Sequence, residues 1–515
     1  MSAIRDCLDR QQTGPFPPNL HRQCHPSLLI GDVLIRVFSY LPKSALGAAA
    51  ITCRAWSDLA LRALWNNVDL KSLLGMLSPI VEFQEYRTLP GLRFLNEDAL
   101  TNEDWGRFRL VSPHVRRVTF PSGSRLHDTV VKRMQNSSFS SIPILPNLRE
   151  LEWAGAHSNS TYFMGPSLRF LDITLLAEWR SSEGIIPVVS QIAIAAPNLT
   201  TLTLTASIPN TATVNALAGM LELLKVLSSA TFSIDSEAVN LIPVVLALSQ
   251  LPNLQDLVLH YFGSPVPPIW KPLLPKPFPS LRRITFTTPA STNVQQYLNY
   301  LLPSAQLTEV TISKDRWEED WVSDTAGILE VTGRHAQLES FRMYAINNKI
   351  ALSLLIIAPV ASCSRLQTLD IWVGGQTEIA DDDVEFLASR LPLLVCLRLV
   401  PSRGSVKAVA TLRAFAIVAK WCPSIMSVAL QVDARASVPS LRLDKRHRNL
   451  RLVDVRRSHI SHSRSVATFF NELSEVEGFR IAYLRLDRGK DPQRQRVWKE
   501  VATWLPILRK IRGSE

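Results

Sequence analysis

Apolar residues recur along this chain in one short phrase, a small residue or Pro followed by Leu-x-x-Leu-x-Leu or a close variant. The phrase is clearest at residues 145–153, 196–204 and 251–259. The first apolar position of each copy falls at 115, 148, 168, 199, 254, 281, 307, 338, 366, 394, 425, 450 and 481, and a degenerate copy surrounds Phe232 and Ile234. A nearly constant spacing of about 28 residues predicts an array of stacked structural repeats.

Each copy has the pattern of a short strand followed by enough chain for a returning helix. The final Leu-x-Leu alternates with a period of two, as a strand with one buried face requires. Helices are predicted at 214–227, 405–421 and 384–391, the last preceded by three Asp residues at 381–383 that suit a positive helix N-terminus. An ordinary α/β domain is the alternative, but a dozen evenly spaced copies favour the array.

The phrase and its spacing resemble those of leucine-rich repeats. This resemblance implies an α/β fold, a leucine-rich-repeat solenoid with a curved parallel β-sheet and outer helices. The Asn or Cys that the family carries three residues after the last Leu is absent, because Ala156, Phe262, Gly374 and Ser402 stand at those places. The repeats are therefore divergent.

Residues 26–70 differ in pattern and predict a small bundle of three helices. The first helix presents an apolar face made of Val33, Val37 and Leu41, and it ends before Pro42. A bundle of about 45 residues is close to the lower size limit for independent folding. Binding of a partner would therefore help to stabilise this segment.

This N-terminal segment resembles an F-box. Ile30 stands where that family usually has Pro, and Asp32 replaces the usual Glu. The residues that follow the family pattern in order are Leu29, Asp32, Leu34, Val37, Phe38, Leu41, Cys53, Arg54, Trp56, Leu64 and Trp65. Taken with the repeats, the chain resembles divergent, fungal-like F-box proteins that carry C-terminal leucine-rich repeats.

The resemblance implies a substrate-recognition subunit of an SCF-type cullin-RING ubiquitin ligase. The F-box would bind the Skp-type adaptor, and through it the cullin, while the concave face of the repeats holds a target protein. The residues expected to bind the adaptor are Leu29, Ile30, Val33, Leu34, Val37, Leu41 and Trp56. Two alternatives remain: the helices only cap the solenoid, or the chain is a non-catalytic leucine-rich-repeat scaffold without ligase association.

Residues that flank the strand leucines point outward from the sheet and are candidates to contact a target. Arg342, Tyr344, Asp370, Trp372 and Arg398 come from three consecutive repeats. Arg, Tyr and Trp are enriched at binding hot spots, so this cluster predicts the target site. For any one of these residues alone, a solvated strand position is the simpler interpretation.

The net charge of +11 belongs to the C-terminal part. Residues 435–512 hold 19 Lys and Arg against 8 Asp and Glu, whereas the remaining residues hold 37 of each sign. No basic motif with interleaved aromatic residues favours nucleic acid, so a solvated edge or a nuclear-localisation patch is the simpler interpretation. The expected domains are a flexible segment at 1–25, the F-box module at 26–70, a helical joint at 71–112, the solenoid at 113–490 and a basic cap or tail at 491–515.

Several classes of function are not expected from this sequence. The apolar stretches at 185–197 and 350–361 are too short to span a membrane, and charges interrupt the N-terminus where a signal peptide would be. Six cysteines without a CxxC pair favour reduced thiols in the cytoplasm or nucleus. No catalytic motif is present, and the His and Cys groups at 21–25 and 459–462 lack a second ligand pair at zinc spacing. We therefore expect no enzyme activity, cofactor, metal site or membrane partner.

Overall fold

The structure is a computed structural model whose described residues form two compact units, Met1–Leu254 and Gln255–Glu515. Both units consist mainly of parallel strands and helices. The described residues are 31–52, 54–83, 91–95, 102–120, 125–135, 143–154, 158–175, 185–207, 210–235, 241–260, 277–287, 294–295, 298–299, 306–314, 321–345, 351–401, 408–435, 438–439, 447–456, 458–483 and 492–513.

The first unit begins with three helices, α2, α3 and α4, that lead into the first strand of a parallel sheet. The strands of this sheet lie in the order β1-β4-β6-β7-β8-β9, and a separate small sheet has the order β2-β3-β5. The elements are α2 Gly31–Phe38, α3 Lys43–Thr52, α4 Arg54–Trp65, β1 Asn67–Asp69, α5 Leu70–Leu74, β2 Ile80–Phe83, β3 Gly91–Phe94, α6 Asn102–Val111, β4 Arg117–Phe120, β5 Arg125–Leu126, α7 Asp128–Gln135, β6 Glu150–Trp153, β7 Phe170–Leu175, α8 Ile185–Ala195, β8 Thr201–Ser207, α9 Thr211–Leu223, β9 Ser229–Asp235 and α10 Ile242–Ser249, with short 3₁₀ turns at Ser112–His114 and Ser158–Phe163.

The second unit continues the same architecture. Its parallel strands lie in the order β10-β11-β12-β13-β14-β15-β16-β18-β20, and β17 pairs with β19. The elements are β10 Asp256–His260, β11 Arg283–Thr287, β12 Glu309–Lys314, α12 Trp321–Gly333, β13 Ser340–Ala345, α13 Leu354–Ile357, β14 Thr368–Val373, α14 Asp381–Arg390, β15 Cys396–Pro401, α15 Arg413–Trp421, β16 Ser427–Leu430, β17 Asp433–Ala434, β18 Leu452–Asp454, β19 His459–Ile460, α16 Ser463–Leu473, β20 Arg480–Ala482 and α17 Pro492–Gly513, with a 3₁₀ turn at Ala358–Ser362.

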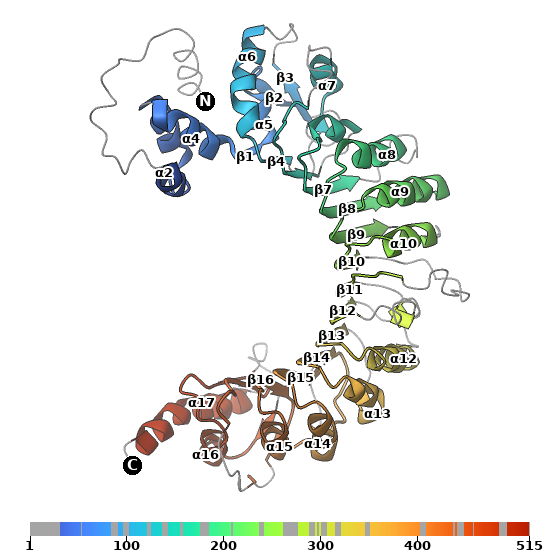
Figure 1. Cartoon of the computed structure of the whole chain (residues 1–515). Helices are drawn as coiled ribbons and strands as arrows, with labels where there is room; N and C mark the ends of the chain where they lie inside the picture. The colour runs from blue at the N-terminus through green and yellow to red at the C-terminus, as the bar shows by residue number, and fades with distance from the viewer. Residues whose placement is uncertain are drawn as a thin grey trace. The chain divides into compact units, whose positions relative to one another are not determined.

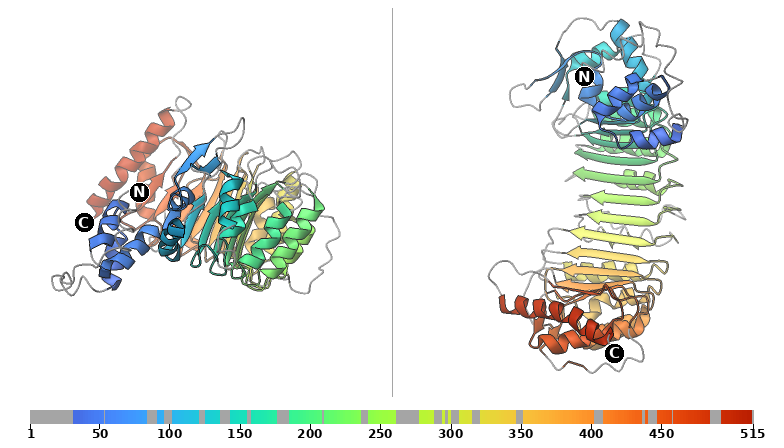
Figure 2. Two further views of the ribbon diagram at one scale, coloured as in Figure 1. Left: turned by 90° about the horizontal axis from the view of Figure 1, so that it is seen from above. Right: turned by 90° about the vertical axis from the view of Figure 1, so that its left-hand side faces the viewer.

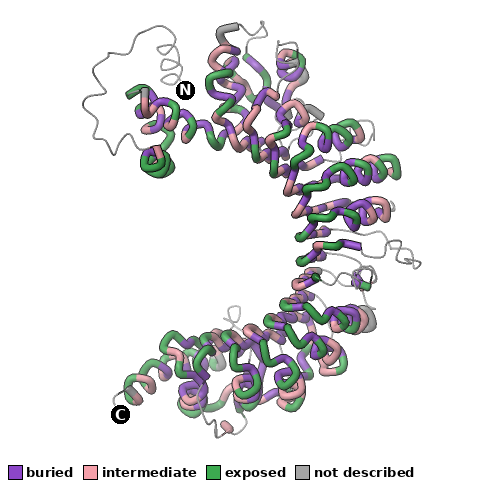
Figure 3. Tube along the Cα trace, in the orientation of Figure 1, coloured by how far each residue is buried: buried purple, intermediate pink, exposed green. Residues whose placement is uncertain are grey.

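Within each unit the helices cover one face of the strands. Figure 1 shows α8 and α9 on one side of β7, β8 and β9, and α12 to α15 on one side of β13 to β16. The right-hand view of Figure 2 shows the strands of each unit side by side, and Figure 3 shows buried residues on strands and helices alike. This is the predicted leucine-rich-repeat-like arrangement of parallel strands and outer helices. No helix among the described residues is long and apolar enough to span a membrane.

The recurring apolar positions form the core. The first apolar residue of twelve copies is buried almost completely; these are Val115, Leu148, Leu168, Leu199, Leu254, Leu281, Leu307, Leu338, Leu366, Leu394, Ile425 and Leu450. The degenerate copy is confirmed, because Phe232 pairs with Leu204 of the preceding strand. The prediction at 481 is wrong by three residues: Ile481 pairs with Val453, which is the second apolar position of its repeat. Gly478 and Phe479 occupy the preceding turn, so the phrase has no leucine to mark its start.

An asparagine directly before the first apolar residue of the phrase joins each of four repeats to the repeat before it. Its side-chain amide donates a hydrogen bond to a turn carbonyl one repeat earlier. The pairs are Asn147 to Pro113 (2.9 Å), Asn198 to Pro166 (3.0 Å), Asn253 to Lys225 (2.9 Å) and Asn449 to Pro423 (3.0 Å). The family's Asn or Cys is missing at its usual place, and these turn asparagines satisfy inter-repeat carbonyls from another position.

The helices begin and end at residues that differ from those predicted from the sequence. Helix α14 begins at Asp381, three residues before the predicted start, and the Asp383 carboxylate accepts from the Ala380 backbone N–H at 2.8 Å. Helix α9 begins at Thr211 because the Asn210 side chain accepts from the Thr213 N–H at 3.0 Å, a standard N-cap bond. It ends at Leu223, four residues before the predicted end. Of the predicted helix at 405–421, the structure describes α15 from Arg413 to Trp421.

Two further segments differ in detail from the expected domains. The expected helical joint at 71–112 contains α5 and α6 and also the strands β2 and β3. The expected basic cap at 491–515 contains the long helix α17, which packs on α16. Trp498 of α17 is buried, and its indole N–H donates to the Ser458 carbonyl at 2.9 Å. The C-terminal segment therefore closes the end of the second unit.

His447 links two repeats through a buried neutral imidazole. Its Nε2 lies 3.1 Å from the Cys422 carbonyl, while its Nδ1 accepts from the backbone N–H groups of Asn449 (3.2 Å) and Leu450 (3.0 Å). Two N–H donors pointing at Nδ1 assign the proton to Nε2. Burial lowers the pKa of His447, and its hydrogen bond to the Cys422 carbonyl opposes that shift only in part.

We predict that Asn198→Ala lowers the free energy of unfolding by about 1 kcal/mol, because it leaves the Pro166 carbonyl without its side-chain donor. Urea denaturation of the whole protein followed by circular dichroism would measure the change. Leu393→Ala is the matched control, since Leu393 occupies the same turn position but carries no donor. Equal losses in both variants would contradict a role for the asparagine bond.

We predict that the stability of the protein falls in mild acid, in part because of His447. A folded-state pKa below the ordinary value of about 6.5 means that the unfolded chain binds the proton first. The contribution of the neutral His447 imidazole to the free energy of unfolding is therefore complete above about pH 6.5, and it is lost as the pH falls from there through the lower folded-state pKa. His447→Gln should reduce the pH dependence of the denaturation midpoint between pH 7 and 5, and an unchanged slope would refute this assignment.

Candidate functional site

Helix α2 in the first unit has one anchored side and one open side. Leu34 and Phe38 are 2% and 3% exposed, and the Phe38 ring meets Trp56 edge-on at 6.2 Å between centroids. Val33 and Val37 lie four residues apart, on one side of the helix, and are 43% and 46% exposed. We call the Val33 and Val37 side the α2 face. It is an apolar surface that the described residues of the unit leave uncovered.

The structure separates the predicted adaptor residues into different environments. Val33 and Val37 lie on the surface, while Leu29 and Ile30 are outside the described residues. Leu34 is buried, so it holds α2 in the bundle and does not line the surface. Leu41 and Trp56 are half-buried: Leu41 lines a hollow beside α4, and Trp56 supports Phe38.

Three further exposed apolar residues, in α2, in α3 and in the turn between them, were not predicted from the sequence. Ile35, Tyr40 and Ile51 present large apolar side chains to solvent. Helical spacing alone identifies which residues share a side of a helix. It does not identify the side that neighbouring helices cover, so these three residues could be found only from the packed bundle.

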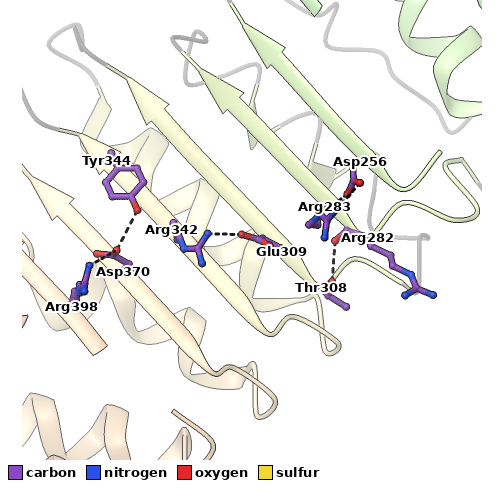
Figure 4. Close-up of polar contacts among 9 residues, drawn as sticks. All are labelled: Asp256, Arg282, Arg283, Thr308, Glu309, Arg342, Tyr344, Asp370 and Arg398. Carbon is purple, nitrogen blue, oxygen red and sulfur yellow. Dashed lines mark hydrogen bonds and ion pairs between the residues drawn. The ribbon is translucent and has the colours of Figure 1, made fainter. Parts of the chain in front are cut away.

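In the second unit, strand register brings together the five residues predicted to bind a target. Arg342, Asp370 and Arg398 are direct neighbours across β13, β14 and β15, and Tyr344 is the neighbour of Trp372 two residues further along. We call these five residues the Asp370 cluster. Figure 4 shows the side chains of four of them, Arg342, Tyr344, Asp370 and Arg398, on adjacent strands.

Asp370 holds other side chains of this cluster in place through its carboxylate. The residue is only 4% exposed. It accepts hydrogen bonds from Trp372 Nε1 at 2.6 Å and Tyr344 Oη at 3.3 Å, and Arg398 lies 3.7 Å from the same carboxylate. A buried carboxylate is tolerated when hydrogen bonds and a nearby cation replace its water. Asp370 was predicted as a contact residue, but its position makes it the residue that holds two aromatic rings and an arginine in place.

The two aromatic rings form one unit. Tyr344 and Trp372 meet at 6.0 Å between ring centroids in an edge-to-face arrangement, and both remain half-buried. Burial raises the pKa of Tyr344, and the Asp370 charge adds to the increase. The phenol therefore stays protonated and donates to Asp370 throughout the neutral pH range.

The arginines of the cluster have carboxylate partners on neighbouring strands. Arg342 pairs with Glu309 at 2.6 Å and not with Asp370 beside it, as Figure 4 shows. Further along the same face Arg283 pairs with Asp256 at 2.5 Å. The charges on this face are thus largely balanced within the protein, and the aromatic rings are its most distinctive feature for recognition.

Arg456 also contacts the Asp370 cluster, although it was not predicted as part of it. Its guanidinium carbon lies 4.3 Å from the centroid of the Trp372 ring, a cation–π contact, and its Nε lies 3.0 Å from Asp454. Arg456 has φ 50°, an unusual backbone conformation for a residue with a side chain, and its N–H donates to Asp454 at 3.0 Å. Two strands, β15 and β16, lie between β14, which carries Trp372, and β18, which Arg456 follows, so sequence adjacency could not reveal the contact.

The two buried cysteines of the second unit are unreactive. Burial raises the pKa of Cys363 to about 11 and that of Cys422 to about 12, so these two thiols stay protonated. Among the described residues, no group of three or more His, Cys, Asp and Glu side chains could hold a metal ion.

Comparison with known proteins identifies the N-terminal module. The model of the F-box-like family matches residues 32–71, and no curated protein sequence matches the chain significantly. Among solved structures, the complex of Rad7 and Elc1 in yeast contains a chain that is similar at 14% identity, with 65% of this chain and 82% of that chain covered and a TM-score of 0.35. Residues 32–71 are therefore an F-box-like domain, followed in this chain by a leucine-rich-repeat-like array of parallel strands and outer helices.

Proposed function

We propose that this protein is the substrate-recognition subunit of an SCF-type cullin-RING ubiquitin ligase. In this proposal the F-box-like domain binds a Skp-type adaptor, which connects it to the cullin, and the repeats hold a target protein. The other subunits would carry out ubiquitin transfer, so this chain needs no catalytic residue and no cofactor. Such a role would place the protein in the cytoplasm or nucleus.

The observation that carries the proposal is the uncovered α2 face within the F-box-like domain. Val33 and Val37 each leave more than two fifths of their surface in water although Leu34 and Phe38 anchor the same helix. Full burial of a valine side chain contributes about 1.5–3 kcal/mol, so covering two half-exposed valines supports a binding energy of a few kcal/mol. Ile35, Tyr40 and Ile51 are further exposed apolar residues of the same domain.

We propose that the target binds over the Asp370 cluster and Arg456. Tyr344 and Trp372 offer apolar area in a fixed orientation, because Asp370 accepts hydrogen bonds from both rings. Preorganised aromatic anchors lose little conformational entropy on binding. Balanced ion pairs around them favour a target segment with an apolar side chain at its centre over one that is uniformly charged.

We predict that Val33→Asp combined with Val37→Asp weakens binding of a purified Skp-type adaptor by at least about a hundredfold, because two carboxylates would be buried without partners. Biolayer interferometry with the full-length protein would measure the affinity. Ile194→Asp on α8 is the matched control, since Ile194 is also an exposed apolar helix residue but lies away from α2.

Two results would contradict the adaptor proposal. A folded wild-type protein that fails to bind the adaptor would favour a leucine-rich-repeat scaffold without ligase association. Equal binding by the wild type and the double variant would show that the α2 face is not the contact surface.

We predict that Trp372→Ala removes target proteins from the complex without affecting the adaptor. Loss of a central aromatic anchor commonly costs at least about 2 kcal/mol, or roughly thirtyfold in affinity. Quantitative mass spectrometry of proteins bound to the wild type and the variant, with the proteasome inhibited, would measure the loss. Thr311→Ala, on the same face of β12, is the control, and the target site would be elsewhere if Trp372→Ala retained every protein that the control retains.

A further inference from the structure

Three arginines occupy one equivalent position in three consecutive repeats of the first unit. This position follows the first apolar residue of each phrase and precedes the strand. The Arg149 N–H donates to the Arg116 carbonyl at 2.8 Å, and the Arg169 N–H donates to the Arg149 carbonyl at 2.8 Å. Neighbouring chains in a sheet lie about 4.8 Å apart. The three arginines thus stand next to one another in a single row, which we call the arginine row.

The arginine row lines a hollow in the surface. Asn147 and Ser167 complete the lining. Arg116 donates through one terminal nitrogen to the Asn147 carbonyl at 2.9 Å, and Arg169 donates in the same way to the Asn198 carbonyl at 2.8 Å. These bonds orient two of the guanidinium groups and use only one of the five N–H donors of each. The remaining donors are available to a ligand in the hollow.

The charge of the row is not balanced by carboxylates. No ion pair among the described residues involves Arg116, Arg149 or Arg169, whereas the neighbouring Arg117 pairs with both Glu150 and Glu152. Burial lowers the pKa of Arg116, and the charges of Arg149 and of Arg62 on α4 lower it further. Three cations held side by side repel one another, and a bound anion would relieve that repulsion.

The same position in the second unit has no such run. There the residues in order are Gln255, Arg282, Thr308, Glu339, Gln367, Val395, Met426, Arg451 and Arg480. Arg451 and Arg480 form an adjacent pair, but no three arginines follow one another. In the first unit the row is bounded by Asn66 before Arg116 and Thr200 after Arg169. The row is therefore a local feature of the first three repeats and not a general property of the fold.

We propose that the arginine row binds a phosphate group. A single arginine fork satisfies a carboxylate, whereas three forks on adjacent chains suit a tetrahedral oxyanion with several acceptor oxygens and about two negative charges. The phosphate could belong to a small phosphorylated molecule or to a phosphorylated side chain of a bound protein. The chemistry of recognition is the same in both cases, and it is independent of the α2 face and of the Asp370 cluster.

The test compares Arg149→Gln with Arg282→Gln in the full-length protein. Arg149 is exposed, and its guanidinium makes no hydrogen bond or ion pair to the part of the chain that the structure describes, so its replacement should leave the fold intact. Arg282 is exposed at the equivalent position of the second unit, where Figure 4 shows its side chain extending apart from the charged pairs. Thermal unfolding by circular dichroism would verify that both variants are folded.

Isothermal titration calorimetry would use two probes, pyrophosphate and a short phosphoserine peptide, with the unphosphorylated peptide as reference. We expect the wild type and Arg282→Gln to bind at least one phosphorylated probe, and Arg149→Gln to bind it at least about tenfold more weakly. Binding of pyrophosphate alone would identify a small phosphorylated molecule as the source, and binding of the peptide alone would identify a phosphorylated protein. The proposal is overturned if the wild type binds neither probe, or if the two variants weaken binding equally.

Discussion

The structure depends on the fact that no single repeat can bury its own apolar residues. Each short strand has one apolar face, and a helix can cover that face only when the neighbouring repeats lie in register on both sides. The backbone bonds between successive turns and the buried leucine before each strand provide that register. The turn asparagines add a side-chain bond between repeats where the usual family residue is absent. Stability and register thus come from the same contacts.

Register also creates the surfaces that we propose for recognition. Because the strands are parallel and aligned, residues at equal positions in successive repeats become lateral neighbours. Asp370 meets Trp372, Tyr344 and Arg398 for this reason, although Tyr344 and Arg398 are far from it in sequence. The arginine row arises in the same way from Arg116, Arg149 and Arg169. A repeat array therefore converts a pattern along the chain into a surface whose chemistry can differ from one stretch to the next.

The F-box-like domain leaves part of its apolar surface exposed, unlike the repeats. Its small bundle uses Leu34, Phe38 and Trp56 to anchor α2 and leaves Val33 and Val37 uncovered. A bundle that buried all of its apolar residues in its own core would have no apolar surface left for the proposed adaptor. A partly covered helix is instead stable enough to be folded and apolar enough to gain from binding.

Local spacing and the alternation of strands were enough to predict the repeat period, the strand positions, the three-helix module and the grouping of Arg342, Tyr344, Trp372 and Arg398. Which side of each element is covered could be seen only in the packed structure. Leu34 and Asp370 proved to be buried supporting residues, the last phrase began three residues before Ile481, and Arg456 met Trp372 across two intervening strands. Burial and long-range pairing are properties of packed elements, and a pattern within one repeat contains no information about what packs against it.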